Sequence, residues 1–164
     1  MTAPALGVSV TDYEQQLWIR GPMPGMNEII SYKDRSYATN NTFRSGRAKR
    51  YDMYSKEKKE WTEKILAAAL AQGLTPCGAS YLTFFVIEPN RRRDPDNLVS
   101  GAMKFILDAL VKGKYLGTDS WVHILGYVPY WEVGDMPGVS VFFRPDRVLT
   151  REECNHGQRE VDFG

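Results

Sequence analysis

Residues 79–98 have the sequence ASYLTFFVIEPNRRRDPDNL, and this stretch decides the fold. Its first ten residues, Ala79 to Glu88, are rich in aromatic and β-branched side chains, which predicts a central strand of a sheet. Asp94 followed by Pro95 is a common way to begin a helix, with Asp94 at the N-cap and Pro95 at the first helical position. We expect this helix to end at Gly113. The stretch therefore predicts a strand that leads into a helix.

Outward from this stretch, the pattern predicts three further strands, at 16–22, 121–130 and 139–144, and one further helix. The helix is expected at 51–72, where apolar residues recur at helical spacing. The Asn- and Ser-rich residues after the turn Pro24 to Asn27 predict a long loop that reaches about Gly46. The predicted fold class is therefore α+β, a single domain with a mixed sheet of about four strands and two main helices.

The chain has 164 residues, which is most simply one domain. We expect a flexible N-terminus at 1–14, the folded domain at 15–145, and a polar C-terminal tail or dimer arm at 146–164. No apolar run approaches the length of a membrane span, and the first residues lack a signal-peptide pattern, so we expect a cytoplasmic protein. The two cysteines, Cys77 and Cys154, match no metal-binding spacing.

The formal net charge of +1 does not by itself favour nucleic-acid binding. Basic residues are nevertheless dense between Lys33 and Lys59, and local density matters more than net charge. Lys49 and Arg50 lie at the end of the basic loop 33–50 and are candidates to clamp DNA. A solvated face of mixed charge is the alternative.

Two carboxylates, Asp94 and Asp96, directly follow the three arginines 91–93, and a third, Asp119, follows the predicted helix. Mg²⁺ takes oxygen ligands from carboxylates and substrate phosphates, and arginines bind phosphate oxygens bidentately. This pattern indicates a metal-dependent site that acts on a phosphodiester. The alternative is helix capping by Asp94, with Asp96 favouring the positive end of the helix dipole.

Helical periodicity places Asp96, Ser100, Lys104 and Asp108 along one stripe. Lys104 is about 12 Å along the axis from Asp96, within reach of a phosphate held by a metal. The alternative for Lys104 is an i,i+4 pair with Asp108. Asp119 joins the other carboxylates only if the chain runs straight back along the helix or if another subunit supplies it.

These motifs resemble those of the RusA-like Holliday-junction resolvases. The similarity comprises Arg93 to Leu98, Lys104, Asp108-Ala109-Leu110, Thr118-Asp119-Ser120 and the early turn Pro24 to Glu28, and it extends from about Leu17 to Arg144. The sequence departs from the family at two positions. Lys104 comes four residues later than the family lysine, and Thr118 replaces the first acid of an acidic pair.

The resemblance implies that Asp94, Asp96 and Asp119 bind Mg²⁺, which Mn²⁺ can replace, and that Lys104 is catalytic. We further expect Arg92, Arg93 and Asn97 to contact nucleic acid. The implied activity is paired hydrolysis of four-way DNA junctions by a homodimer of phage or prophage origin in recombination or repair, without a nucleotide cofactor or a membrane partner. The alternatives are a broader flap or branch nuclease and a DNA-binding protein that does not cleave.

Overall fold

The computed structural model describes residues 15–42 and 53–160. The elements follow in the order β1 (Gln15–Arg20), α1 (Met26–Thr42), α2 (Met53–Ala71), β2 (Ser80–Glu88), α3 (Pro95–Lys112), β3 (Ile124–Val133), β4 (Gly138–Arg144) and α4 (Arg151–Glu160). The predicted α+β class with a four-stranded mixed sheet is confirmed. No helix in the described ranges is both long and apolar enough to cross a bilayer. The predicted flexible N-terminus, Lys49 and Arg50 lie outside the described residues.

The sheet has the strand order β1-β4-β2-β3. Strand β4 pairs antiparallel with both β1 and β2, whereas β3 pairs parallel with β2. The chain therefore crosses from β3 over β2 to reach β4, and β3 forms one edge of the sheet. This topology places the end of β2 and the beginning of α3 beside the end of β3.

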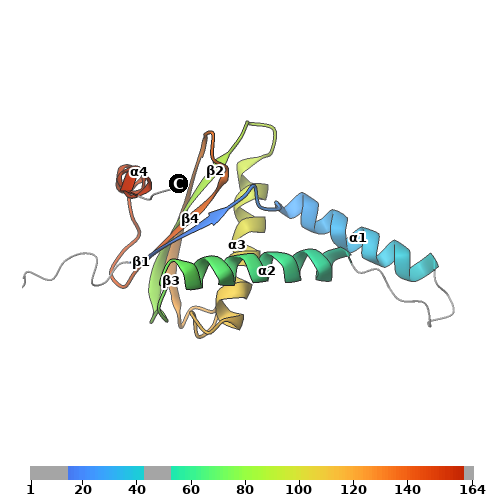
Figure 1. Cartoon of the computed structure of the whole chain (residues 1–164), viewed down its shortest axis with the longest axis horizontal. Helices are drawn as coiled ribbons and strands as arrows, with labels where there is room; N and C mark the ends of the chain where they lie inside the picture. Colours follow the sequence, from blue (N-terminus) through green and yellow to red (C-terminus); the bar gives the residue numbers. More distant parts are fainter. Residues whose placement is uncertain (1–14, 43–52, 161–164) are drawn as a thin grey trace, which may run out of the picture.

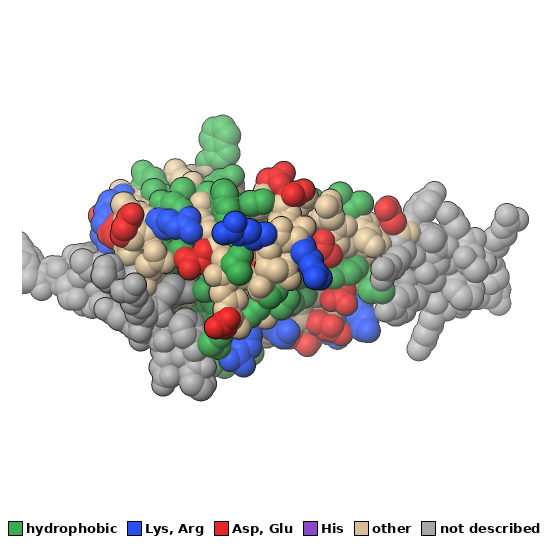
Figure 2. All heavy atoms as spheres, turned by 90° about the horizontal axis from the view of Figure 1, so that it is seen from above, with side chains coloured by type: hydrophobic (Ala, Val, Ile, Leu, Met, Phe, Trp, Pro, Cys, Tyr) green, Lys and Arg blue, Asp and Glu red, His purple; other side chains and the backbone are tan. Residues whose placement is uncertain are grey.

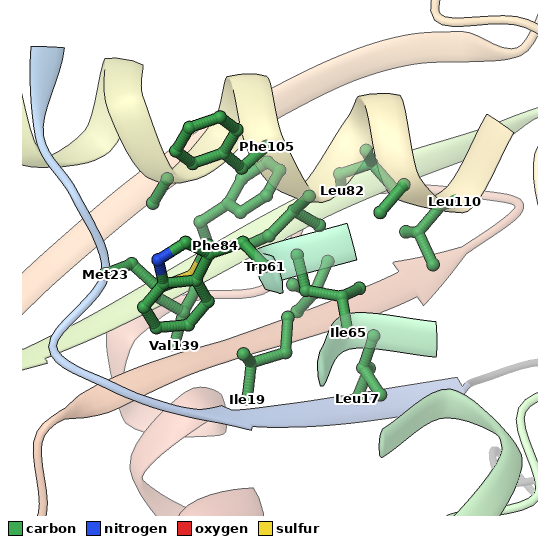
Figure 3. Packing of buried hydrophobic residues seen from close by; sticks show 14 of the residues in the cluster. Leu17, Ile19, Met23, Trp61, Ile65, Leu82, Phe84, Phe105, Leu110 and Val139 are labelled. Carbon is green, nitrogen blue, oxygen red and sulfur yellow. The ribbon is translucent and has the colours of Figure 1, made fainter. Parts of the chain in front are cut away.

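One face of the sheet packs against α2 and α3 and forms the main core (Figures 1 and 3). Phe84 from β2, Phe105 from α3 and Ile65 from α2 are almost completely buried there. Burial of each such side chain stabilises the fold by about 1.5–3 kcal/mol. The opposite face carries a smaller cluster in which Phe85 and Phe142 pack against Leu149 and Cys154.

The structure corrects the expectation of a long loop after Asn27, because residues 26–42 form α1. A glutamate in the first turn supports the start of this helix: Gly25 donates its backbone N–H to Glu28 Oε1 at 3.2 Å. The helix extends away from the sheet in Figure 1. Because its sequence is polar on most sides, it lacks the apolar periodicity that revealed α2 and α3.

The structure also corrects the expectation of a polar tail from residue 146. Residues 151–160 form α4, and Leu149 and Cys154 are buried against the sheet. Thr150 and Glu153 form a reciprocal cap, in which Thr150 N–H donates to Glu153 Oε1 and Glu153 N–H donates to Thr150 Oγ1. The folded domain therefore includes α4.

Candidate active site

Asp94 and Asp96 lie where β2 passes into α3. Asp94 occupies the N-cap position, with φ −70° and ψ 136°, and Pro95 is the first helical residue, as predicted. The Asp94 side chain makes no capping hydrogen bond. Both aspartates are exposed, and within the described part of the chain neither forms an ion pair. Their carboxylates are therefore accessible to a ligand from solution.

Arg93 connects three segments of the chain at this junction. Its Nε and Nη2 atoms donate to the two carboxylate oxygens of Glu88, each at 2.9 Å, and Nη2 also donates to the carbonyl oxygen of Met23 at 2.8 Å. Its Nη1 atom forms an ion pair with Glu28. The Glu88 side chain is only 8% exposed. The Arg93 guanidinium is therefore occupied by protein carboxylates in this structure.

The two glutamates are functional candidates that the sequence analysis missed. Burial acts to raise the pKa of Glu28, but hydrogen bonds from Arg93 and the Gly25 N–H outweigh it and hold that pKa below its usual value. A local signal existed for each residue: Glu88 ends the central strand, and Glu28 is the first-turn acid of α1. Glu28 and Arg93 are 65 positions apart in the sequence, so no local pattern reveals their ion pair.

The turn at Pro24 and Gly25 packs directly on the first half of α3. A Cβ atom added to Gly101 would lie 2.4 Å from the Pro24 carbonyl oxygen, and one added to Gly25 would lie 3.1 Å from the Asn97 carbonyl oxygen. The two motifs are thus in contact, although more than 60 residues separate them. Asn97 is half-buried under this turn.

Lys104 shares one side of α3 with Asp96 and Ser100, as the helical periodicity predicted. All three residues line the same hollow of about 530 Å³ between α3 and β3. Lys104 Nζ lies 3.7 Å from Asp108 Oδ2, which is the i,i+4 pair considered above, and Lys58 Nζ lies 3.1 Å from the same oxygen. Lys58 is thus the closer partner of Asp108. Exposed pairs of this kind are worth less than about 1 kcal/mol, so Lys104 remains able to change partners.

Asp119 lies at the far end of α3 from Asp94 and Asp96. It belongs to the turn that follows the helix, and the 18 residues of α3 span about 27 Å. Among the described residues, no group of three or more His, Cys, Asp or Glu side chains gathers closely enough to hold a metal ion. One chain therefore brings Asp94 and Asp96 together but does not bring Asp119 to them.

A continuous groove nevertheless connects the two ends. The hollow that contains Asp96 adjoins a second hollow, of about 490 Å³, that contains Asp119. The two hollows share Met103, Leu107 and Tyr127. We call this feature the α3–β3 groove: it runs along the edge of the sheet from Asp119 to Asp96.

Arg92 is exposed beside the aspartates. On the face shown in Figure 2, positive and negative side chains are interspersed and form no large patch of one sign. Basic residues near the aspartates are therefore more useful guides to a phosphate-binding position than the overall charge of that face.

No protein-family model matches the chain, and a comparison with curated proteins finds no match. The resemblance described above therefore rests on its motifs: the early turn packs on the first half of α3, the arginine–aspartate segment leads into this helix, and Lys104 lies near its middle.

Proposed function

We propose that this protein is a metal-dependent endodeoxyribonuclease that hydrolyses phosphodiester bonds at four-way DNA junctions and acts as a homodimer. The observation that most supports this proposal is the exposure of the Asp94 and Asp96 carboxylates. Two carboxylates stand one residue apart at the start of α3, exposed and without a cation partner among the described residues, although capping would engage the first of them.

The donor set fits Mg²⁺ or Mn²⁺, because these ions prefer oxygen ligands and are bound by few carboxylates together with water and phosphate. Asp94 and Asp96 would hold the ion. When bound, such an ion activates water and offsets charge on the phosphoryl oxygens.

The surrounding residues have separate roles in this proposal. Arg92 is exposed and would bind the DNA backbone, while Arg93 would hold the Asp94–Asp96 segment through Glu28 and Glu88. Lys104 lies on the same side of α3 as Asp96 and would stabilise negative charge on the phosphate. Asn97 lies one residue from Asp96, and we assign it to the DNA-facing end of the helix.

The third carboxylate would come from a second copy of the chain. The α3–β3 groove has Asp119 at one end and Asp96 at the other, so a two-fold axis through its middle places each end against the opposite end of the partner. Such a dimer forms two composite sites, and a four-way junction has two strands to cut.

The first test is cleavage of a labelled synthetic four-way junction with Mg²⁺, with EDTA, and by Asp96→Asn. We expect paired nicks that disappear with EDTA, and a loss of at least 100-fold in rate for Asp96→Asn with junction binding retained. Asp135→Asn, at an exposed aspartate in the β3–β4 turn, is the matched control.

Two results would contradict the proposal. Binding without cleavage under all metal conditions would favour a DNA-binding protein in which Asp94 only begins a helix. Equal cleavage of flaps and single-stranded branches would favour a broader branch nuclease with the same site.

A further inference from the structure

The turn between α3 and β3 presents two apolar side chains to solvent. Trp121 is 93% exposed and Val122 is 71% exposed, the two highest values among the large hydrophobic residues described apart from Leu70 on α2. We call this pair the Trp121 tip. Exposure of a whole tryptophan side chain leaves a large apolar surface in water, and such surfaces commonly mark binding sites.

The tip stands on a turn that hydrogen bonds hold in place. Thr118 Oγ1 lies 2.6 Å from Ser120 Oγ and 3.2 Å from His123 Nδ1. Ser120 accepts backbone hydrogen bonds from His123 at 3.1 Å and from Ile124 at 2.9 Å. The backbone of the turn is therefore held in place before any partner binds, which lowers the entropy cost of binding.

A matching apolar surface lies at the other end of the α3–β3 groove. Trp131 and Val133, near the end of β3, are 44% and 45% exposed, and Trp131 lines the groove together with Pro95. A third hollow, of about 620 Å³, continues from there past Leu98 to Asp94, and its lining also includes the charged side chains Arg91, Glu132 and Arg151. This part of β3, which is the edge strand of the sheet, is therefore only partly covered.

We propose that the Trp121 tip of one copy of the chain docks on Trp131 and Pro95 of a second copy. The inference rests on the proposed homodimer but makes a separate claim. Trp121 is two residues from Asp119, so a two-fold arrangement that brings Asp119 to the partner's Asp94–Asp96 end also brings the tip to the apolar surface there. Each dimer contains this contact twice, and it positions Asp119.

The fit is chemical as well as geometric. Tryptophan is among the residues that most often dominate the energetics of protein interfaces, especially where it meets another aromatic side chain in a pocket. The pairing of Trp121 with Trp131 satisfies both conditions. It also explains why a turn held by hydrogen bonds carries a tryptophan that is 93% exposed.

The test measures the dimer dissociation constant of Trp121→Ser, Leu70→Ser and Trp121→Phe by light scattering over a dilution series. Leu70 is 78% exposed on α2 and serves as a matched control away from the groove. We expect Trp121→Ser to raise the dimer dissociation constant at least tenfold, Leu70→Ser to leave it unchanged, and Trp121→Phe to retain most of the affinity.

Fluorescence supplies a second readout that needs neither DNA nor metal. The difference in emission between the wild-type protein and Trp121→Phe reports Trp121, which should shift to the blue and resist acrylamide quenching as the protein dimerises. An unchanged dissociation constant for Trp121→Ser, or a Trp121 that acrylamide quenches fully in the dimer, would overturn the proposal. Shielding that appears only after DNA is added would also overturn it, because the tip would then contact DNA.

These measurements separate this inference from the proposed function. A dimer that depends on Trp121 but never cleaves DNA supports the docking contact and contradicts the nuclease. If the protein cleaves DNA and Trp121→Ser leaves the dimer dissociation constant unchanged, the result supports the nuclease and contradicts the docking contact.

Discussion

At the scale of single residues, the position of Asp94 and the state of its side chain carry different information. The Asp-Pro sequence predicted an N-cap, and the backbone of Asp94 occupies that position. The carboxylate itself makes no capping bond. The start of α3 is thus fixed by Pro95 and by packing, which leaves Asp94 free for another ligand.

Arg93 differs from its neighbours because it serves the structure of the site. Its guanidinium binds Glu88 through two atoms and Glu28 through a third. Local sequence could not predict which of the three arginines binds the two glutamates, because the arginines are consecutive. Only the fold brings Glu28 to Arg93. The predicted DNA contact is consequently better assigned to Arg92.

Loss of the Arg93 contacts is expected to destabilise the protein. Arg93→Gln leaves the buried Glu88 carboxylate without its cation, which should cost about 2–3 kcal/mol. Urea denaturation measures this loss. Arg92→Gln, at an exposed neighbour, should change stability by less than about 0.5 kcal/mol but weaken junction binding. Equal stability losses for both variants would contradict the role of Arg93.

At the scale of elements, the sequence predicted those segments that contain runs or repeats of apolar residues. Strands β2 and β4 are buried almost throughout and are rich in apolar residues, whereas the apolar residues of α2 and α3 recur at helical spacing. Helix α1 contributes Ile29 to the main core, but it was missed because most of its residues are polar.

Helix α4 was missed although its capping signal is present in the sequence. Thr150 and Glu153 form the capping pattern. Hydrogen bonds from the Arg147 side chain, and to a lesser extent from the Thr150 N–H, lower the pKa of the Glu153 carboxyl group to about 2. The polar composition of the segment outweighed this signal in the prediction. Leu149, just before α4, and Cys154 within it pack on the sheet, and the Leu149 N–H also donates to Thr83 Oγ1 at 2.8 Å.

The contact between the Pro24–Gly25 turn and α3 depends on Gly101. Gly101→Ala places a Cβ atom 2.4 Å from the Pro24 carbonyl oxygen, so the turn must move. The clash should cost about 1–3 kcal/mol and outweigh the gain of about 1 kcal/mol in helix propensity. Thermal denaturation measures the change.

Gly78→Ala is the matched control for this variant. A Cβ atom there meets no other atom within 4 Å, so stability should change little. A Gly101→Ala protein as stable as Gly78→Ala would show that the turn and α3 do not need their close approach.

At the scale of the whole molecule, the sheet is covered unequally. The main core lies over β1, β4 and β2, whereas the edge strand β3 exposes Leu125, Tyr127, Trp131 and Val133. The α3–β3 groove lies along this edge and has acidic residues at both ends. We infer that a second copy covers it.

The sequence identified Asp94, Asp96 and Asp119 as one candidate set, but it could not place them. Asp94 and Asp96 are neighbours in sequence and share a helix start, so their proximity was local. The position of Asp119 depends on the turn after α3 and on the parallel pairing of β3 with β2, which are set by the whole fold.

The most direct test of the composite site is complementation between two inactive variants. Asp96→Asn and Asp119→Asn should each abolish junction cleavage as pure proteins. A mixed dimer of the two has one site in which both changes meet and one site that is intact. We therefore predict that mixing them, with subunit exchange verified by native mass spectrometry, restores nicking of one strand of the junction. Verified mixed dimers that remain inactive would contradict a site built from two chains.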